Sequence, residues 1–255
     1  IRVLSFAAGE PDFDTPQPIK DAACRAIAEG KTKYTAAKGM PGLCAAVARK
    51  FAEKNGISYD PDSEILISSG GKQSLCNAFL ALLERGDEVL IPSPYWLSYP
   101  EMVRIAGGEP RFVKTDRENG CKLTVAALEA AFAESGGRAK ALVLNYPSNP
   151  TGAVYSATEL RALGEAAVRL GLWIVADEMY ERMVYTEAPF VSVASLSPEI
   201  RARTVTVNGC SKAYAMTGWR IGYAGAPAPL MRLMATCQSH LASNPCTDRK
   251  STRLN

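Results

Sequence analysis

Hydrophobic positions along this chain follow two patterns that alternate. Short runs of consecutive aliphatic and β-branched residues, typical of buried strands, are separated by longer stretches in which apolar residues recur every three or four positions, as on one face of a helix. The runs predict strands at 65–67, 88–91, 110–114, 139–144, 172–180, 204–207 and 221–225, with a further short strand inside 1–17. The helical stretches are 18–29, 43–52, one that follows residue 72, 123–132, 160–170 and 227–238. This alternation predicts an α/β fold with a largely parallel sheet.

The strand predicted at 65–67 runs into Ser-Ser-Gly-Gly-Lys just before a predicted helix. A strand, a glycine pair and a helix start direct free backbone N–H groups and the positive end of the helix dipole at one point, which suits a phosphate group. By itself, a glycine pair is more often an ordinary strand-to-helix turn. Gly70 and Gly71 are therefore candidates for an anion site, and Lys72 adds a positive charge beside them.

Two further strand ends carry polar side chains. The almost wholly apolar run 172–180 contains Asp177, and because an unpaired buried carboxylate is costly, we expect a cation to meet it. The run 139–144 is followed by Asn-Tyr-Pro-Ser-Asn-Pro-Thr-Gly, whose prolines and glycine end the strand and whose asparagines supply polar side chains. From this turn Asn149 can donate a hydrogen bond to a ligand or, alternatively, close an Asx turn. We predict that the Asn149–Pro150 bond is cis.

The strand predicted at 204–207 leads to Lys212 in a turn punctuated by glycines. An amine desolvated by apolar surroundings loses its preference for the ammonium form and can condense with an aldehyde as a Schiff base. Arg220 follows eight residues later and is a fixed cation suited to a phosphate. For an arbitrary pair, an exposed loop lysine and a salt-bridged surface arginine would be the simpler interpretation.

Composition narrows the class of protein. The chain has 255 residues, of which 47% are hydrophobic, enough to bury the core of one large or two medium domains. Its net charge of +3 comes from scattered basic residues, which argues against nucleic acid and anionic membranes as partners. The 7 cysteines lie far apart and there is 1 histidine, which argues against structural zinc and a disulfide framework and favours a reducing cytoplasm.

Two segments resemble those of class I pyridoxal 5'-phosphate (PLP) aminotransferases, and within them the bacterial aspartate aminotransferase branch. They are Gly-Glu-Pro-Asp-Phe-Asp-Thr-Pro at 9–16 and Ser-Lys-Ala-Tyr-Ala-Met-Thr-Gly-Trp-Arg-Ile-Gly at 211–222. The resemblance implies the fold type I architecture, a three-layer α/β domain with helices on both faces of a mostly parallel sheet. It also implies a homodimer with shared active sites.

The same resemblance divides the chain. Residues 1–13 are expected to lead into a PLP-binding large domain at 14–247, and the tail at 248–255 departs from the family pattern and is expected to be disordered. The chain looks truncated at both ends, with the small domain largely missing. The arginine that clamps the substrate α-carboxylate belongs to that domain and has no match in this sequence.

The resemblance assigns roles around the cofactor ring. Lys212 would form the Schiff base with PLP, Asp177 would pair with the protonated pyridine nitrogen, and Trp96 would stack on the ring. Asn149 would donate to the ring O3′ oxygen. Tyr180 would place its phenol near the same oxygen, although a tyrosine packed on the sheet is the alternative.

Further roles concern the phosphate and the substrate. The implied cofactor-binding set also includes Gly70, Gly71, Lys72, Ser211 and Arg220, with Tyr34 reaching the phosphate of the neighbouring subunit. The implied substrate contacts are Gly9, Lys72, Trp96 and Asn149. Gly9 lets its backbone approach the substrate unless it is a plain turn glycine. Lys72 reads the distal carboxylate of an acidic substrate or merely adds charge beside the phosphate.

The implied function is transamination in amino-acid metabolism and biosynthesis. An amino group would move between an L-amino acid, aspartate or another acidic one, and a 2-oxo acid such as 2-oxoglutarate, with ping-pong kinetics. Without the clamping arginine, little activity is expected from this chain alone. The alternatives are a PLP-dependent C–S β-lyase on the same fold and an inactive folded remnant. A dinucleotide-binding sheet is disfavoured because no G-x-G-x-x-G follows a strand.

Overall fold

A computed structural model describes residues 9–187 and 189–246. The short strand predicted near the N-terminus and the tail predicted at 248–255 fall outside the described residues. Within them, no helix combines the length and the apolarity needed to span a bilayer.

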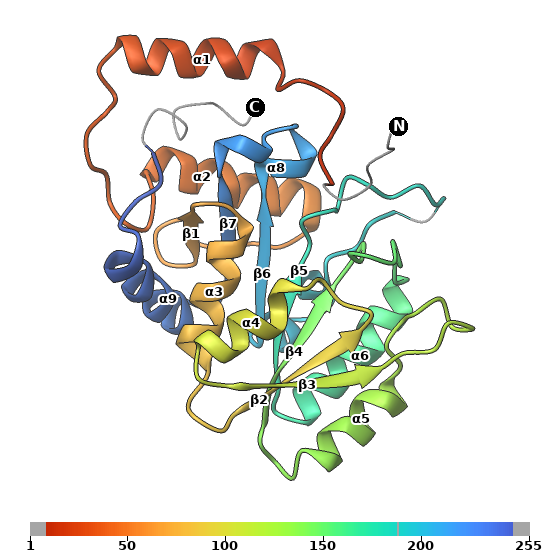
Figure 1. Cartoon of the computed structure of the whole chain (residues 1–255). Coiled ribbons are helices and arrows are strands. Elements are labelled where there is room, and N and C mark those ends of the chain that lie inside the picture. Colours follow the sequence, from red (N-terminus) through yellow and green to blue (C-terminus); the bar gives the residue numbers. More distant parts are fainter. Residues whose placement is uncertain (1–8, 188, 247–255) are drawn as a thin grey trace, which may run out of the picture.

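Seven strands of the described chain form one sheet in the order β1-β7-β6-β5-β4-β2-β3 (Figure 1). They are β1 Ile65–Ser68, β2 Glu88–Ser93, β3 Glu109–Lys114, β4 Ala139–Asn145, β5 Trp173–Asp177, β6 Thr204–Gly209 and β7 Gly222–Gly225. The neighbouring pairs from β6 to β3 are parallel, whereas β7 is antiparallel to both β1 and β6. The predicted mostly parallel sheet is confirmed.

Consecutive apolar residues in the strands reflect a sheet that is covered on both faces. Every residue of β1 and β6 is buried, for example. The strand predicted at 172–180 is wrong at its end, because β5 stops at Asp177. The Asp177 carboxylate accepts a hydrogen bond from the Met179 backbone N–H at 3.2 Å, which closes an Asx-type turn and ends the strand.

The helices occupy most of the predicted stretches. The α-helices are α1 Gln17–Ala28, α2 Pro41–Lys50, α3 Gly71–Leu82, α4 Ser98–Ile105, α5 Val125–Glu134, α6 Ala157–Arg169, α7 Pro198–Arg201, α8 Cys210–Ala213 and α9 Ala228–Leu241, and the shorter elements are η1 Phe51–Asn55, η2 Val193–Ser195 and η3 Thr217–Trp219. Several starts follow from local chemistry: a proline opens α2, and Ser156 and Glu159 form a capping box at α6. The short helices α4, α7 and α8 were not predicted, because each offers too few turns for a visible period.

Three layers result. Helices α3, α4 and α9 pack on one face of the sheet, where Leu75, Met102 and Met234 belong to one buried cluster. Helices α5 and α6 cover the other face, with Leu128 and Leu160 in a second cluster. This confirms the predicted helices on both faces. Helix α1 lies apart from the sheet, above α2 in Figure 1.

The sheet brings the predicted site residues to one edge. Because β1, β2, β4, β5 and β6 point the same way, their carboxyl ends share an edge, and the antiparallel β7 begins there. Connections at the carboxyl ends of parallel strands are where α/β proteins bind ligands.

Candidate active site

A cavity of about 650 Å³ lies at this edge of the sheet. The predicted residues that line it are Gly9, Gly71, Lys72, Trp96, Asn149, Asp177, Tyr180, Ser211, Lys212 and Arg220. Two predicted residues are not among its lining residues: Gly70, which adjoins Gly71, and Tyr34. The sheet therefore gathers side chains from widely separated parts of the sequence into one site.

Lys212 lies in the helical turn α8, directly after the buried β6, and not in an irregular turn. Its ammonium donates a hydrogen bond to the Gly9 backbone carbonyl, and Nζ lies 5.8 Å from the centre of the Tyr180 ring. Burial lowers the pKa of Lys212, the negative charge of Glu10 raises it, and the positive charge of Arg220 lowers it. The net lowering makes this amine a better nucleophile near neutral pH than a surface lysine.

One end of the cavity suits an anion. Gly70 caps helix α3 with φ +85°, a conformation that side chains rarely adopt, and a Cβ there would collide with the Arg220 guanidinium. Arg220 itself has φ +58° and donates from Nη1 to the Thr217 carbonyl at 2.9 Å. Among the first N–H groups of α3, that of Gln73 donates to the Gly70 carbonyl at 3.1 Å, whereas those of Gly71 and Lys72 precede the helical hydrogen-bond pattern, so these two and the guanidinium can serve the same ligand.

Asp177 supplies a buried acid on another wall. It is 6% exposed, and burial raises its pKa above the ordinary value, while hydrogen bonds from the Tyr99 hydroxyl and the Met179 N–H lower it. Tyr99 donates to Oδ2 at 2.7 Å. No ion pair to this carboxylate is found among the described residues, so the expected cation is not a side chain of that part of the chain. Tyr99 was missed, and the only sequence signal for it was its position among the aromatics after β2.

Two asparagines organise the turn after β4. The Asn149–Pro150 bond is cis, as predicted. The Asn149 side chain donates from Nδ2 to the Tyr180 hydroxyl at 3.4 Å, inside the cavity. Asn145 holds this turn from its start, because its Oδ1 accepts from the Asn149 backbone N–H, four residues on, at 2.8 Å. Asn145 also donates to the Asp177 carbonyl at 3.0 Å and was not predicted as part of the site.

Trp96 and Lys72 form a pair at the cavity mouth. The Trp96 indole is half-buried and meets Tyr99 edge-on, with ring centroids 5.3 Å apart. The Lys72 Nζ lies 4.9 Å from the centre of the Trp96 ring, within cation–π range. Lys72 is exposed, so its ammonium is also accessible to a charged ligand.

Gly9 and Tyr34 are less constrained by the described chain. A Cβ on Gly9 would meet no atom within 4 Å, so nothing in the described chain itself requires glycine there. Tyr34 is 91% exposed in the loop between α1 and α2. Its predicted role across a subunit interface stays a prediction.

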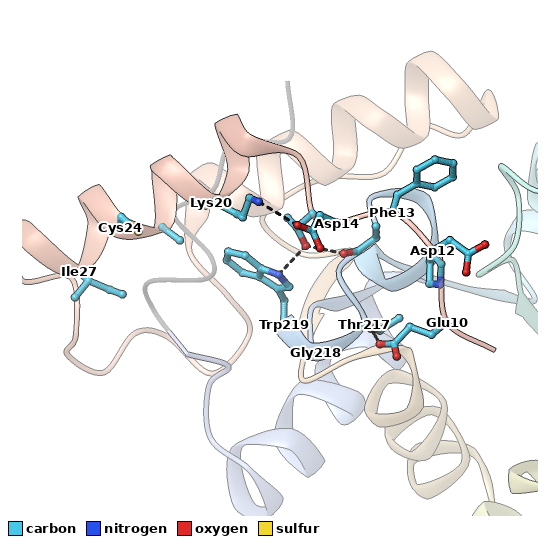
Figure 2. A pocket seen from close by; sticks show the side chains of 14 residues that line it. Glu10, Asp12, Phe13, Asp14, Lys20, Cys24, Ile27, Thr217, Gly218 and Trp219 are labelled. Carbon is cyan, nitrogen blue, oxygen red and sulfur yellow. Dashed lines mark hydrogen bonds and ion pairs between the residues drawn. The ribbon is translucent and has the colours of Figure 1, made fainter. Parts of the chain in front are cut away.

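A second cavity, of about 710 Å³, lies between α1 and η3 (Figure 2). The Trp219 indole lines it and donates to the Thr15 hydroxyl at 3.0 Å. None of the predicted site residues lines it. A hydrogen bond from the Thr217 hydroxyl to the Glu10 carboxylate lies where the two cavities adjoin.

Comparisons with known proteins agree on one family. The model of aminotransferase class I and II matches residues 1–250. An aspartate aminotransferase of Geobacillus stearothermophilus is 49% identical over 243 residues, which cover 95% of this chain and 61% of that protein. An aspartate/prephenate aminotransferase of Cereibacter sphaeroides is 51% identical, with coverage of 96% and 60%. The crystal structure of the aspartate aminotransferase from Rhizobium meliloti matches with a TM-score of 0.92 at 48% identity, covering 96% of this chain and 61% of that one. The chain thus spans about 60% of the length of these relatives.

Proposed function

This chain belongs to the aminotransferase class I and II family, and from that premise we propose that its protein transfers an amino group between an L-amino acid and a 2-oxo acid with PLP. Aspartate or another acidic amino acid is the proposed donor, and 2-oxoglutarate is a fitting acceptor. The observation that carries the proposal is one cavity that gathers the Lys212 amine, the buried Asp177 carboxylate and the Arg220 guanidinium.

The chemistry of the donor set fits PLP. The N-terminus of α3 with Arg220 and Ser211 suits the phosphate, and the buried Asp177 carboxylate suits a protonated ring nitrogen. When bound, PLP supplies an electron sink for the bond that breaks at the amino acid Cα. Tyr99 keeps Asp177 oriented, because burial raises the pKa of its phenol well above the ordinary value and its hydroxyl therefore stays a donor.

Lys212 has two tasks in this proposal. Its partly desolvated amine would condense with the cofactor aldehyde, with loss of water, and so hold the cofactor on the chain. When an incoming amino acid takes the place of the lysine, the same Nζ would accept the proton that leaves the substrate Cα. The Gly9 carbonyl, which now accepts a hydrogen bond from Nζ, has to release it for either task.

Side chains on the walls orient the reactants. The Trp96 indole offers a flat face for ring stacking and excludes water from that side. Asn149 and Tyr180 bring a donor amide and a phenol to one point, which suits the ring O3′ oxygen. These roles are proposals that rest on the family and on the shared cavity.

Lys72 supports an acidic substrate. Its exposed ammonium lies over Trp96 at the cavity mouth, where it can meet a distal carboxylate. Relatives named for aspartate, several of them for prephenate as well, support the same class. The proposal also includes a homodimer, to which Tyr34 contributes across the interface, and a cytoplasmic location.

Titrating this chain with PLP while recording absorbance tests the proposal. We expect saturable binding with an imine band, and Lys212→Ala should abolish that band. Lys140→Ala, at the opposite end of β4, is the matched control and should keep it. An unchanged band in Lys212→Ala would show that another group holds the cofactor, and no binding to the wild-type chain would favour the inactive remnant.

Product analysis separates the two chemistries. Incubation of the wild-type chain with aspartate and 2-oxoglutarate should give glutamate, at the low rate expected of a sequence in which the carboxylate-clamping arginine has no match. The variant Lys72→Ala should weaken use of aspartate more than use of an uncharged amino acid. Release of pyruvate from cystathionine without amino transfer would favour the C–S β-lyase instead.

A further inference from the structure

Glu178 follows Asp177 in the chain but faces away from the solvent entirely. Its side chain is 0% exposed, and its backbone N–H donates to the Val207 carbonyl at 2.9 Å. Oε1 accepts two hydrogen bonds, from the Tyr146 hydroxyl at 2.8 Å and from the Ser192 hydroxyl at 2.6 Å. Oε2 is buried without a hydrogen-bond partner among the described residues.

Tyr146 makes this carboxyl group part of a larger connection. Its hydroxyl donates to Glu178 and accepts from the Val193 backbone N–H at 2.7 Å. Its ring is stacked on Phe190, with centroids 5.5 Å apart, and meets Tyr155 edge-on at 6.0 Å. Burial raises the pKa of the Tyr146 phenol well above the ordinary value, so the hydroxyl remains a donor at neutral pH.

The same tyrosine belongs to the turn that carries both asparagines of the cavity. Beyond its hydroxyl, the turn is tied to β5 at the Asp177 carbonyl, by the Tyr146 N–H at 3.2 Å and by Asn145 at 3.0 Å. Further along the turn, Asn145 Oδ1 accepts from the Asn149 backbone N–H at 2.8 Å, and between these two asparagines the Tyr146 ring is anchored through its hydroxyl. We propose that Glu178, through the Tyr146 hydroxyl, is a positioning residue for the turn that carries Asn149.

Filling space would not explain this carboxyl group. A buried carboxyl without a cationic partner costs more than an apolar side chain of the same size. The nearby Lys50 forms its ion pair with Glu181, at 2.7 Å, and not with Glu178. The two accepted hydrogen bonds are what Glu178 adds to the core, and one of them ends on the turn of the site.

Hydrogen–deuterium exchange on the chain without added PLP tests the positioning role. Tyr146→Phe should speed exchange in peptides covering 145–153, whose amides are held by bonds such as Ser148 N–H to Ala153 O at 3.0 Å. Tyr155→Phe is the matched control, because Tyr155 lies in the same aromatic cluster but its hydroxyl accepts from Leu123 N–H.

A graded series at Glu178 adds a second arm. Glu178→Gln keeps an acceptor for the Tyr146 hydroxyl and should leave exchange in 145–153 near that of the wild type, whereas Glu178→Ala should speed it. Equal exchange in Tyr146→Phe and Tyr155→Phe would overturn the positioning role. Both sets of exchange measurements need neither cofactor nor activity.

The link to ligand binding rests on the proposed function and has its own measurement. Tyr146→Phe should raise the Kd for PLP about threefold to tenfold, the size expected for one hydrogen bond, and Tyr155→Phe should not. A loosened turn with unchanged Kd would overturn the link between Glu178 and Asn149. A wild-type chain that fails to bind PLP would defeat the proposed function, while the exchange data would still decide whether Glu178 holds the turn.

Discussion

Replacing Glu178 with glutamine should remove a pH dependence from the stability of this fold. Burial raises the pKa of Glu178 from an ordinary 4.5 to about 7, against the lowering effect of hydrogen bonds from Ser192 and Tyr146. The charge of Glu181 raises this pKa further and that of Lys50 lowers it. Because the folded chain holds this proton more tightly than the unfolded chain, stability is lost as the pH rises from the unfolded pKa to the folded one.

The magnitude follows from the two pKa values. Glutamine does not titrate, so the free energy of unfolding of Glu178→Gln should rise relative to the wild type by about 2 to 3 kcal/mol between pH 5 and pH 8. Urea denaturation at half-unit pH steps, analysed by linear extrapolation, measures this difference. The sign is specific: the variant gains on the wild type toward high pH.

Glu88 provides a control of opposite character. It is also buried, but its pKa lies below the ordinary value, and the largest cause of this lowering is the hydrogen bond from Arg111. Its carboxylate is therefore charged in the folded chain throughout this range, and Glu88→Gln should lose a nearly constant amount of stability from pH 5 to pH 8. Parallel curves for Glu178→Gln and the wild type would refute the reasoning, because they would mean that Glu178 is not held protonated by burial.

Two other substitutions test the walls of the cavity. Gly70→Ala should cost about 1 to 3 kcal/mol of stability, since φ +85° with ψ 161° is a glycine conformation and the new Cβ meets Arg220. In the same urea assay Gly42→Ala, in the open first turn of α2, should gain up to about 1 kcal/mol, and a similar effect at both positions would contradict the strain argument. Tyr99→Phe should cost about 1 to 3 kcal/mol at pH 7 because it leaves Asp177 with one donor fewer, and wild-type stability would show that the hydrogen bond contributes nothing.

The sequence predicted those parts of the fold that local pattern determines. Strand positions followed from apolar runs, because both faces of the sheet are covered, and Lys212, Asp177 and Asn149 stood at strand ends. The sheet order and the antiparallel β7 could not be read locally, since they depend on which strands meet. The end of β5 was overestimated because the Asx-type turn at Asp177 involves a polar contact that an apolar run does not reveal.

Two of the residues that were missed, Tyr99 and Tyr146, share one property. The rings of both tyrosines pack in the buried clusters on either side of the sheet, as aromatic side chains usually do. Their hydroxyl groups donate hydrogen bonds to Asp177, at the end of β5, and to Glu178, just after it. These partners lie far from the tyrosines in the sequence. A hydroxyl partner of this kind is a consequence of tertiary structure, so periodicity and motif cannot supply it.

The reversed direction of β7 determines how two functional groups are coupled. A parallel β7 would have required a crossover to the far edge of the sheet before the chain could return. Instead the chain leaves β6 and re-enters the sheet at the same edge. Lys212 and Arg220 therefore lie on a single short connection whose two ends are held by the paired strands β6 and β7. The positions of the amine and the guanidinium are consequently set by the same two strands, and a shift of the connection between those strands displaces both groups together.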